Sequence, residues 1–442
     1  MKLEGKYYSK NIEVLGYHDL NDRPGFQMAL QEVNGKYYLY CSHFRHSGVT
    51  ILDVTDPEHI RFVRFIEGPK LSGQLVNKIQ VADGLMLCAL GTGIPFLHNI
   101  GRDDPYKAGL LIYDVKTDPE NPILLSEWSA GEAQPCDNTC LGVHRFFYNG
   151  GRYVHLAATC DGFYNMIYRI LDIQDPTNPV EVGRWWMPEQ WENGLLEKDK
   201  PNTKFPMDYA GLHGPPYVKG NHVYCGYNGA GVVILDISDI RLPKLVGRLD
   251  TNAILGGKWG GARTHTVWPL SKRPYAVFTN EGERFTCLNQ EMIAGKAQPL
   301  NVLGIVDCSD VSDPTLISVC PYPEVPKDFP YKNFNDCGLG VNGPFGPHNI
   351  HEPHDHPDLE DRNDRLYCCY FHAGLRIYDI DDPYRPQEIA YFIPPKPKKW
   401  CFENTYRGPK LAITEDIIVD KRGYIFIDTF HDGVYALKCT VD

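Results

Sequence analysis

The chain has 442 residues, 14 cysteines and a formal net charge of −12. A chain this acidic is a poor partner for nucleic acid or for an anionic membrane surface. The first residues lack the apolar stretch of a signal peptide, and no run of about 18 apolar residues follows, so we expect neither secretion nor a membrane span. Without a secretion signal the cysteines are expected to be reduced thiols, which favours a cytoplasmic location.

An internal repeat dominates the sequence. A run of apolar residues ending in Asp recurs six times and is followed by a turn rich in Asp and Pro, and a seventh, degraded copy closes the chain. The runs are VTILDV (49–54), LLIYDV (110–115), YRILDI (168–173), VVILDI (232–237), LGIVDC (303–308), LRIYDI (375–380) and VYALKC (434–439). Repeats of this length should be interpreted before any other pattern, because they define the whole architecture.

Each repeat contains about four short apolar segments, and long amphipathic helical patterns are missing. This pattern predicts an all-β fold, a single seven-bladed β-propeller over residues 1–442. The last copy stops after its third strand, and residues 7–15 supply the missing outer strand that closes the ring. An open β-solenoid is the competing architecture. The predicted blades cover about 16–66, 73–128, 140–186, 209–249, 262–320, 345–393 and 408–442.

The apolar run followed by an Asp-Pro turn resembles the repeat of the LVIVD-repeat propeller family. The period of the repeat matches along nearly the whole chain. This resemblance implies the propeller fold. It implies no single function, because one fold hosts many activities.

In a propeller the first strand of each blade begins at the same mouth of the central channel where the second strand ends. The predicted starts of the first strands are Gln27, Asn77, His144, His213, His265, His348 and Glu415. The turns after the second strands add His46, Asp161, Asn228, Glu281, Glu283, His372 and His431. About eight of the 16 histidines therefore gather at one mouth.

Four consecutive blades carry His at the matching position, which predicts a metal site built from His144, His213, His265 and His348. Imidazole suits Fe, Mn, Zn and Cu, so the expected cofactor is a divalent transition metal of unknown identity. A metal-free catalytic site and an inherited packing residue remain as alternatives. Carboxylates expected to orient these imidazoles are Glu281, Glu283, Glu352 and Glu415.

Catalytic roles are predicted for His46, His372, His431, Arg263 and Glu281. The histidines of the ligand-rich segment 347–357 are expected in different places. His351 should point away from the channel, whereas His354 and His356 should lie on a solvated loop at the far face.

The predicted function is that of a metal-dependent enzyme acting on a small polar or anionic organic substrate. A lyase is favoured, because the site is similar to that of propeller polysaccharide lyases, with His265, His348 and Gln27 of matching residue type. The alternative is an oxidoreductase, because four-His centres resemble those of carotenoid cleavage oxygenases, although the sequence lacks an evident apolar tunnel. A non-enzymatic binding platform, with Trp185, Trp186 and Trp191 at its surface, is the third hypothesis.

Overall fold

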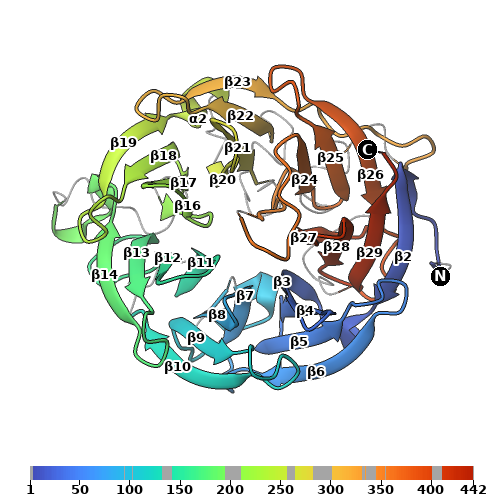
Figure 1. The fold of residues 1–442 in the computed structure, drawn as a ribbon, viewed down its shortest axis with the longest axis horizontal. Coiled ribbons are helices and arrows are strands. Elements are labelled where there is room, and N and C mark those ends of the chain that lie inside the picture. Colours follow the sequence, from blue (N-terminus) through green and yellow to red (C-terminus); the bar gives the residue numbers. More distant parts are fainter. Residues whose placement is uncertain are drawn as a thin grey trace.

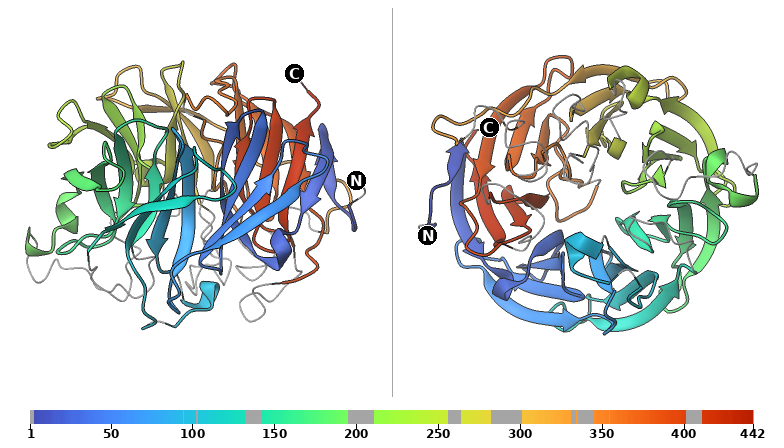
Figure 2. Two further views of the ribbon diagram at one scale, coloured as in Figure 1. Left: turned by 60° about the horizontal axis from the view of Figure 1, so that its bottom comes forward. Right: turned by 180° about the vertical axis from the view of Figure 1, so that it is seen from behind.

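The computed structural model describes residues 3–93, 95–101, 103–131, 142–194, 211–255, 264–281, 301–330, 334, 345–353, 355–400 and 411–441. Seven antiparallel sheets surround one axis in chain order, and the prediction of an all-β, seven-bladed propeller is confirmed (Figure 1). Seen from the side, the blades form a disc with the strands running between its two faces (Figure 2). Among the described residues no helix is long and apolar enough to cross a membrane.

The first three blades are simple four-stranded meanders. Blade 1 contains β3 (Gly25–Val33), β4 (Lys36–His43), β5 (Gly48–Asp53) and β6 (Arg61–Glu67). Blade 2 contains β7 (Leu75–Ala82), β8 (Leu85–Gly91), β9 (Gly109–Asp114) and β10 (Ile123–Ser129). Blade 3 contains β11 (Val143–Phe147), β12 (Tyr153–Ala158), β13 (Ile167–Asp172) and β14 (Val180–Trp185).

Blade 5 keeps this pattern, whereas blades 4, 6 and 7 depart from it at their inner or outer edges. In blade 4, β15 (Gly211–Leu212) and β16 (Tyr217–Lys219) both pair with β17 (His222–Asn228), followed by β18 (Gly231–Asp236) and β19 (Lys244–Leu249). Blade 5 contains β20 (Thr264–Pro269), β21 (Tyr275–Asn280), β22 (Leu303–Asp307) and β23 (Thr315–Val319). Blade 6 contains β24 (Arg365–Cys369), β25 (Leu375–Asp379) and β26 (Gln387–Ile393), with a single inner bridge from Ile350 to Cys368. Blade 7 contains β27 (Thr414–Val419), β28 (Tyr424–Thr429) and β29 (Gly433–Cys439).

The described helices are short: α1 (Pro95–His98), α2 (Thr251–Leu255) and the 3-10 turns Leu20–Asp22, Pro188–Gln190 and Glu192–Gly194.

The N-terminal segment closes the ring, as predicted. Strand β2 (Ile12–His18) pairs with β29 in blade 7, with Val14 opposite Leu437. The closing strand lies further along the chain than the predicted 7–15, because β1 (Tyr8–Lys10) pairs instead with β26 and adds an outer strand to blade 6. Strand β2 near the N-terminus and β29, the last strand of the chain, thus lie side by side (Figure 1).

The repeated apolar run forms the third strand of each blade and is buried on both faces. Ile51 packs in a cluster with Val76 and Ile79 of blade 2, whereas Leu52 packs with Phe426 of blade 7. Alternate side chains of a strand point to opposite faces, so each run joins two neighbouring blades. This explains why polar residues rarely interrupt it.

The Asp that ends each run builds the following turn. Asp53 accepts a hydrogen bond from the backbone N–H of Thr55, and its carboxylate pairs with Arg61. The same bond to the backbone two residues on is made by Asp114, Asp172, Asp236, Asp307 and Asp379. Asp stabilises turns in this way, so the repeated carboxylate has a structural role.

Candidate metal centre

The inner strands carry a β-bulge where the sequence places the candidate site residues. In β11 the pairing with β12 shifts between Val143 and Arg145, which leaves His144 as the extra residue. In β20 it shifts between Thr264 and Thr266, which leaves His265. Corresponding shifts occur in β3, β7 and β27. A bulge breaks the strict alternation of a strand and redirects side chains.

The four predicted metal histidines lie in one row. The ring centroids are 4.6 Å apart for His144 and His213, 4.4 Å for His213 and His265, and 4.5 Å for His265 and His348. The structure therefore brings together side chains from four consecutive blades. That they bind a metal remains a prediction.

Glu281 lies across this row. It follows β21 directly, in the turn where the second strand of blade 5 ends. Its Oε2 is 3.8 Å from Nε2 of His213 and 3.9 Å from Nε2 of His265, and its Oε1 is 3.7 Å from Nε2 of His348. The turn after the second strand thus meets the start of the first strands, as expected.

His213, His265 and Glu281 can hold a metal ion, because one ligand atom of each lies within 4.8 Å of the others. Nitrogen and oxygen ligands bind zinc at about 2.0–2.2 Å, so two ligands of a tetrahedral ion lie ~3.4 Å apart. The three side chains would therefore need to move only slightly closer together to coordinate such an ion. The His265 side chain is 1% exposed, whereas those of His213 and Glu281 are each 18% exposed, so solvent reaches the group from their side.

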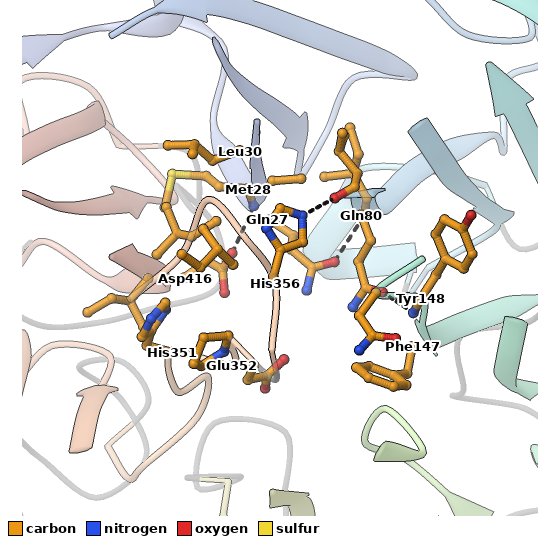
Figure 3. A pocket seen from close by; sticks show the side chains of 18 of the residues that line it. Gln27, Met28, Leu30, Gln80, Phe147, Tyr148, His351, Glu352, His356 and Asp416 are labelled. Atoms are coloured by element: carbon orange, nitrogen blue, oxygen red, sulfur yellow. Dashed lines mark hydrogen bonds between the residues drawn. The ribbon is translucent and has the colours of Figure 1, made fainter. Parts of the chain in front are cut away.

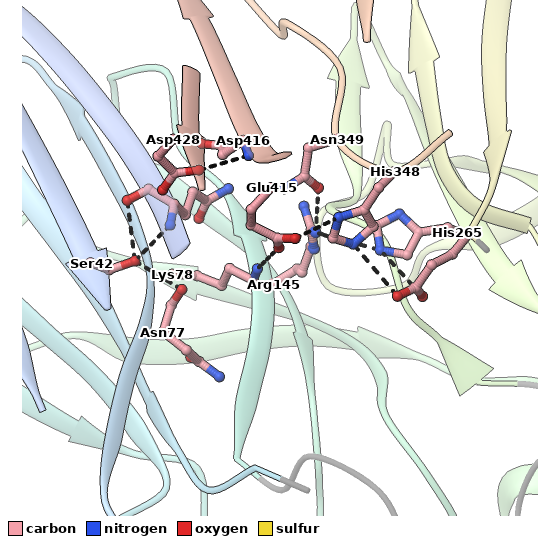
Figure 4. A network of polar contacts seen from close by, with 12 residues as sticks. Ser42, Asn77, Lys78, Arg145, His265, His348, Asn349, Glu415, Asp416 and Asp428 are labelled. Carbon is pink, nitrogen blue, oxygen red and sulfur yellow. Dashed lines mark hydrogen bonds and ion pairs between the residues drawn. The ribbon is translucent and has the colours of Figure 1, made fainter. Parts of the chain in front are cut away.

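A hydrogen bond at Nδ1 fixes the orientation of the His265 ring. Arg145 Nη2 lies 3.4 Å from Nε2 of His265 and 3.5 Å from Nε2 of His348. A guanidinium can only donate, so both Nε2 atoms accept and both protons reside on Nδ1. Nδ1 of His265 then donates to Thr266 Oγ1 at 2.7 Å. Nδ1 of His348 lies 3.0 Å from Glu415 Oε2, at an angle outside that of a good hydrogen bond (Figure 4).

Burial keeps the imidazoles neutral. It holds the pKa values of His144, His265 and His348 well below their usual range, and the nearby charge of Arg145 adds to this effect. Neutral imidazole is the form that binds a metal.

Charged side chains lie next to the row, and of these the sequence analysis identified Glu415 but missed Arg145, Lys78 and Asp416 (Figure 4). Arg145 is buried in the bulge of β11. Lys78, in the bulge of β7, places Nζ 3.8 Å from Glu415 Oε1 and 3.6 Å from the centre of the Phe26 ring. Burial raises the pKa values of Glu415 and Asp416 to about 7, against the opposing effect of Lys78 and Arg145.

The other predicted catalytic residues have the following surroundings. His46 is exposed beside His43. His372 packs against Phe334 and Phe345, with Nε2 3.3 Å from the Phe334 carbonyl oxygen. The ring of His431 lies 4.2 Å from that of Trp400. Arg263 and Glu283 fall outside the described residues.

Gln27 and the segment after His348 line a pocket (Figure 3). Gln27 Oε1 accepts from the backbone N–H of Ile79. The expectation that His356 is solvated is wrong: it is buried, with Nε2 2.8 Å from the carbonyl oxygen of Val81, because its loop folds inward. His351 is buried as well, with Nε2 2.8 Å from the Glu360 carbonyl oxygen, whereas His354 falls outside the described residues.

The surroundings of the row are less polar than expected. The ring of His348 stacks on Phe371, with centroids 4.6 Å apart and planes 20° apart. Phe371 belongs to a buried cluster with Phe26, Phe44, Trp400, Ile413 and Phe430. One side of the candidate centre is therefore apolar.

Fold and site together define a seven-bladed β-propeller with a candidate His/Glu metal centre at its inner strands. Two segments, residues 217–251 and 297–321, match the LVIVD repeat. The chain thus contains LVIVD repeats, in line with the resemblance seen in its sequence. A comparison with curated proteins yields no significant match.

Several solved propellers are similar to the chain over nearly their full length. Sqt1 of Saccharomyces cerevisiae is 8% identical, with a TM-score of 0.51 and coverage of 96% of this chain and 98% of that one. The periplasmic gluconolactonase PpgL of Pseudomonas aeruginosa is 9% identical, with a TM-score of 0.50 and coverage of 96% and 92%. Streptogramin B lyase is 13% identical, with a TM-score of 0.48 and coverage of 98% and 97%. At such low identity the likeness concerns the fold alone.

Proposed function

We propose that the protein is a metal-dependent enzyme whose divalent ion is held by His213, His265 and Glu281. The observation that carries this proposal is the convergence of three ligand atoms within 4.8 Å, one of them on a nearly inaccessible imidazole. His144 and His348 extend the row on either side and are available as further ligands. Fe, Mn, Zn and Cu all suit this donor set.

The reaction we favour is an elimination or hydration on a small polar or anionic organic molecule. A bound ion would supply Lewis acidity toward a carbonyl or carboxylate. Next to the row lies Glu415, whose pKa burial raises to about 7, in the range that general acid–base catalysis at neutral pH requires. The partial exposure of His213 and Glu281 marks the side from which such a molecule would approach.

Oxidoreductase chemistry is the second candidate, and two observations favour it. Two histidines and one carboxylate are the ligand set of many non-haem iron oxygenases. In addition, the aromatic cluster that Phe371 joins to His348 supplies the apolar surroundings that the sequence did not reveal. Oxygen consumption by the iron-loaded protein separates the two candidates.

The decisive experiment is elemental mass spectrometry on the purified protein and on a variant carrying His213→Ala and His265→Ala. We expect near-stoichiometric metal in the wild type and its loss in the double variant. His59→Ala is the matched control, because this histidine is exposed in a turn of blade 1 and should leave the metal content unchanged. No metal in the wild type, even after reconstitution, would overturn the proposal and favour a binding platform.

A further inference from the structure

Arg145 is a buried cation at the edge of the candidate centre. It is 1% exposed, and its Nη2 donates to Asn349 Oδ1 at 2.5 Å. The same nitrogen contacts Nε2 of His265 and of His348. The guanidinium therefore contacts two of the four histidines of the row directly (Figure 4).

The other nitrogens of this guanidinium have no acceptor in the part of the chain that the structure describes. Nε and Nη1 of Arg145 are buried without a hydrogen-bond partner, and so is Nδ2 of Asn349 beside them. Among the described residues no carboxylate forms an ion pair with Arg145 either. Buried donors are nearly always satisfied, and a charged donor left alone is costly. Three such donors in one place indicate a missing acceptor.

A metal ion in the centre would compete with Arg145. Nε2 of His265 is both the atom that Arg145 contacts and the ring nitrogen that faces Glu281. A divalent ion there would lie close to the guanidinium, and two buried cations repel each other strongly in a low-dielectric interior. An anion bound between them would attract both.

We propose that Arg145, assisted by the Asn349 amide, binds a carboxylate group of the substrate, and that this carboxylate and the metal bind cooperatively. This inference rests on the proposed metal-dependent function and narrows its substrate to a carboxylic acid. An Arg guanidinium donates charge-assisted N–H bonds to carboxylates, and Nε and Nη1 of Arg145 are each available for one such bond.

The test is a titration of Co²⁺, with its free concentration buffered by a chelator, in the presence and absence of malonate. In the wild type, malonate should tighten the apparent Kd for Co²⁺ by on the order of tenfold, a typical coupling between two ligands. In Arg145→Met, Co²⁺ should bind more tightly without malonate, because the competing cation is gone, and malonate should have little further effect. Arg145→Lys keeps the charge and should retain part of the coupling. Arg385→Met, at an exposed site in the blade 6 turn, is the control.

The outcomes separate this inference from the proposed function. If the wild type binds Co²⁺ equally well with and without malonate, the inference is overturned and the metal centre stands. If the wild type binds no metal, the proposed function fails, and malonate is titrated into the metal-free protein instead. Binding that is lost in Arg145→Met and kept in Arg385→Met would then still support the anion site, and no binding would overturn it. The wild-type measurement decides the question even if Arg145→Met folds poorly.

Discussion

Nδ1 of His265 lies 2.7 Å from the hydroxyl oxygen of Thr266, the next residue along the chain. The two side chains meet because His265 is the extra residue of a bulge. The hydroxyl accepts the Nδ1 proton and so leaves Nε2 as the nitrogen that faces Glu281 at 3.9 Å. Thr266 thereby fixes both the tautomer and the ring orientation of a candidate metal ligand.

Thr266→Val tests this relationship. Valine has the same shape and lacks the hydroxyl, so the variant should fold while His265 loses its orienting partner. Removing such a partner typically weakens metal affinity by about 10–100-fold. The measurement is a competition titration with a chromogenic chelator. Thr266→Ser keeps the hydroxyl and should bind within a few-fold of the wild type; equal affinity in Thr266→Val would contradict the orienting role.

Metal should also stabilise the fold. A ligand that binds only the native state at 100 times its Kd adds about 2.7 kcal/mol to the free energy of unfolding. Denaturant titrations with and without metal should show this gain in the wild type and a smaller one in Glu281→Gln, since an amide oxygen is a weaker ligand. Glu127→Gln, at an exposed ion pair with Lys107, is the control and should keep the full gain. An equal gain in Glu281→Gln would argue against this carboxylate as a ligand.

Sequence reasoning found the histidine row because the repeat supplies a common frame. One side chain per blade at a matching position must meet at the axis once the ring closes, so His144, His213, His265 and His348 could be placed together without coordinates. Glu281 was recognised as well, because it ends a second strand at the same mouth.

The same reasoning missed Arg145 and Lys78 for a physical reason. Each directly follows a predicted inner residue, and strict alternation in a strand assigns it to the opposite face. The bulges overturn that assignment by inserting one residue into the ladder. Backbone irregularities of this kind leave little trace in the side-chain pattern. The inward fold of the loop carrying His356 was likewise invisible, because it depends on the carbonyl of Val81, 275 positions away in the chain.

Ring closure should depend on Gly433. This glycine has φ of +94°, and a Cβ there would lie 2.3 Å from the carbonyl oxygen of His18 in the closing strand. Gly433→Ala therefore combines the ~1–2 kcal/mol cost of a left-handed conformation with an overpacking cost of about 1–3 kcal/mol. Gly423→Ala is the matched control, because Gly423 has φ of +81° and nothing within 4 Å of the added Cβ. Denaturant unfolding should show a clearly larger loss of the free energy of unfolding for Gly433→Ala than for Gly423→Ala. Equal losses would mean that the contact with the His18 carbonyl oxygen adds no cost.

The buried carboxyl pair of blade 7 should make stability fall as the pH rises. Asp428 is fully buried, and its Oδ1 accepts from the backbone N–H of Asp416. Burial, followed by the neighbouring carboxyl groups of Asp416 and Glu415, holds the pKa of Asp428 well above its usual range.

In the unfolded chain an Asp loses its proton near pH 4, so above that pH the native state binds more protons than the unfolded state. The free energy of unfolding must then decrease with rising pH until the native group also ionises. Asp428→Asn keeps the acceptor for Asp416 and removes the titration. Its free energy of unfolding should therefore exceed that of the wild type at pH 8 by more than at pH 5. Asp310→Asn gives the opposite control, since hydrogen bonds from Ser312 lower the pKa of that exposed carboxyl, and the substitution should bring no gain at pH 8. If the free energies of unfolding of Asp428→Asn and the wild type differ by the same amount at both pH values, this carboxyl has the same pKa in the native and the unfolded state.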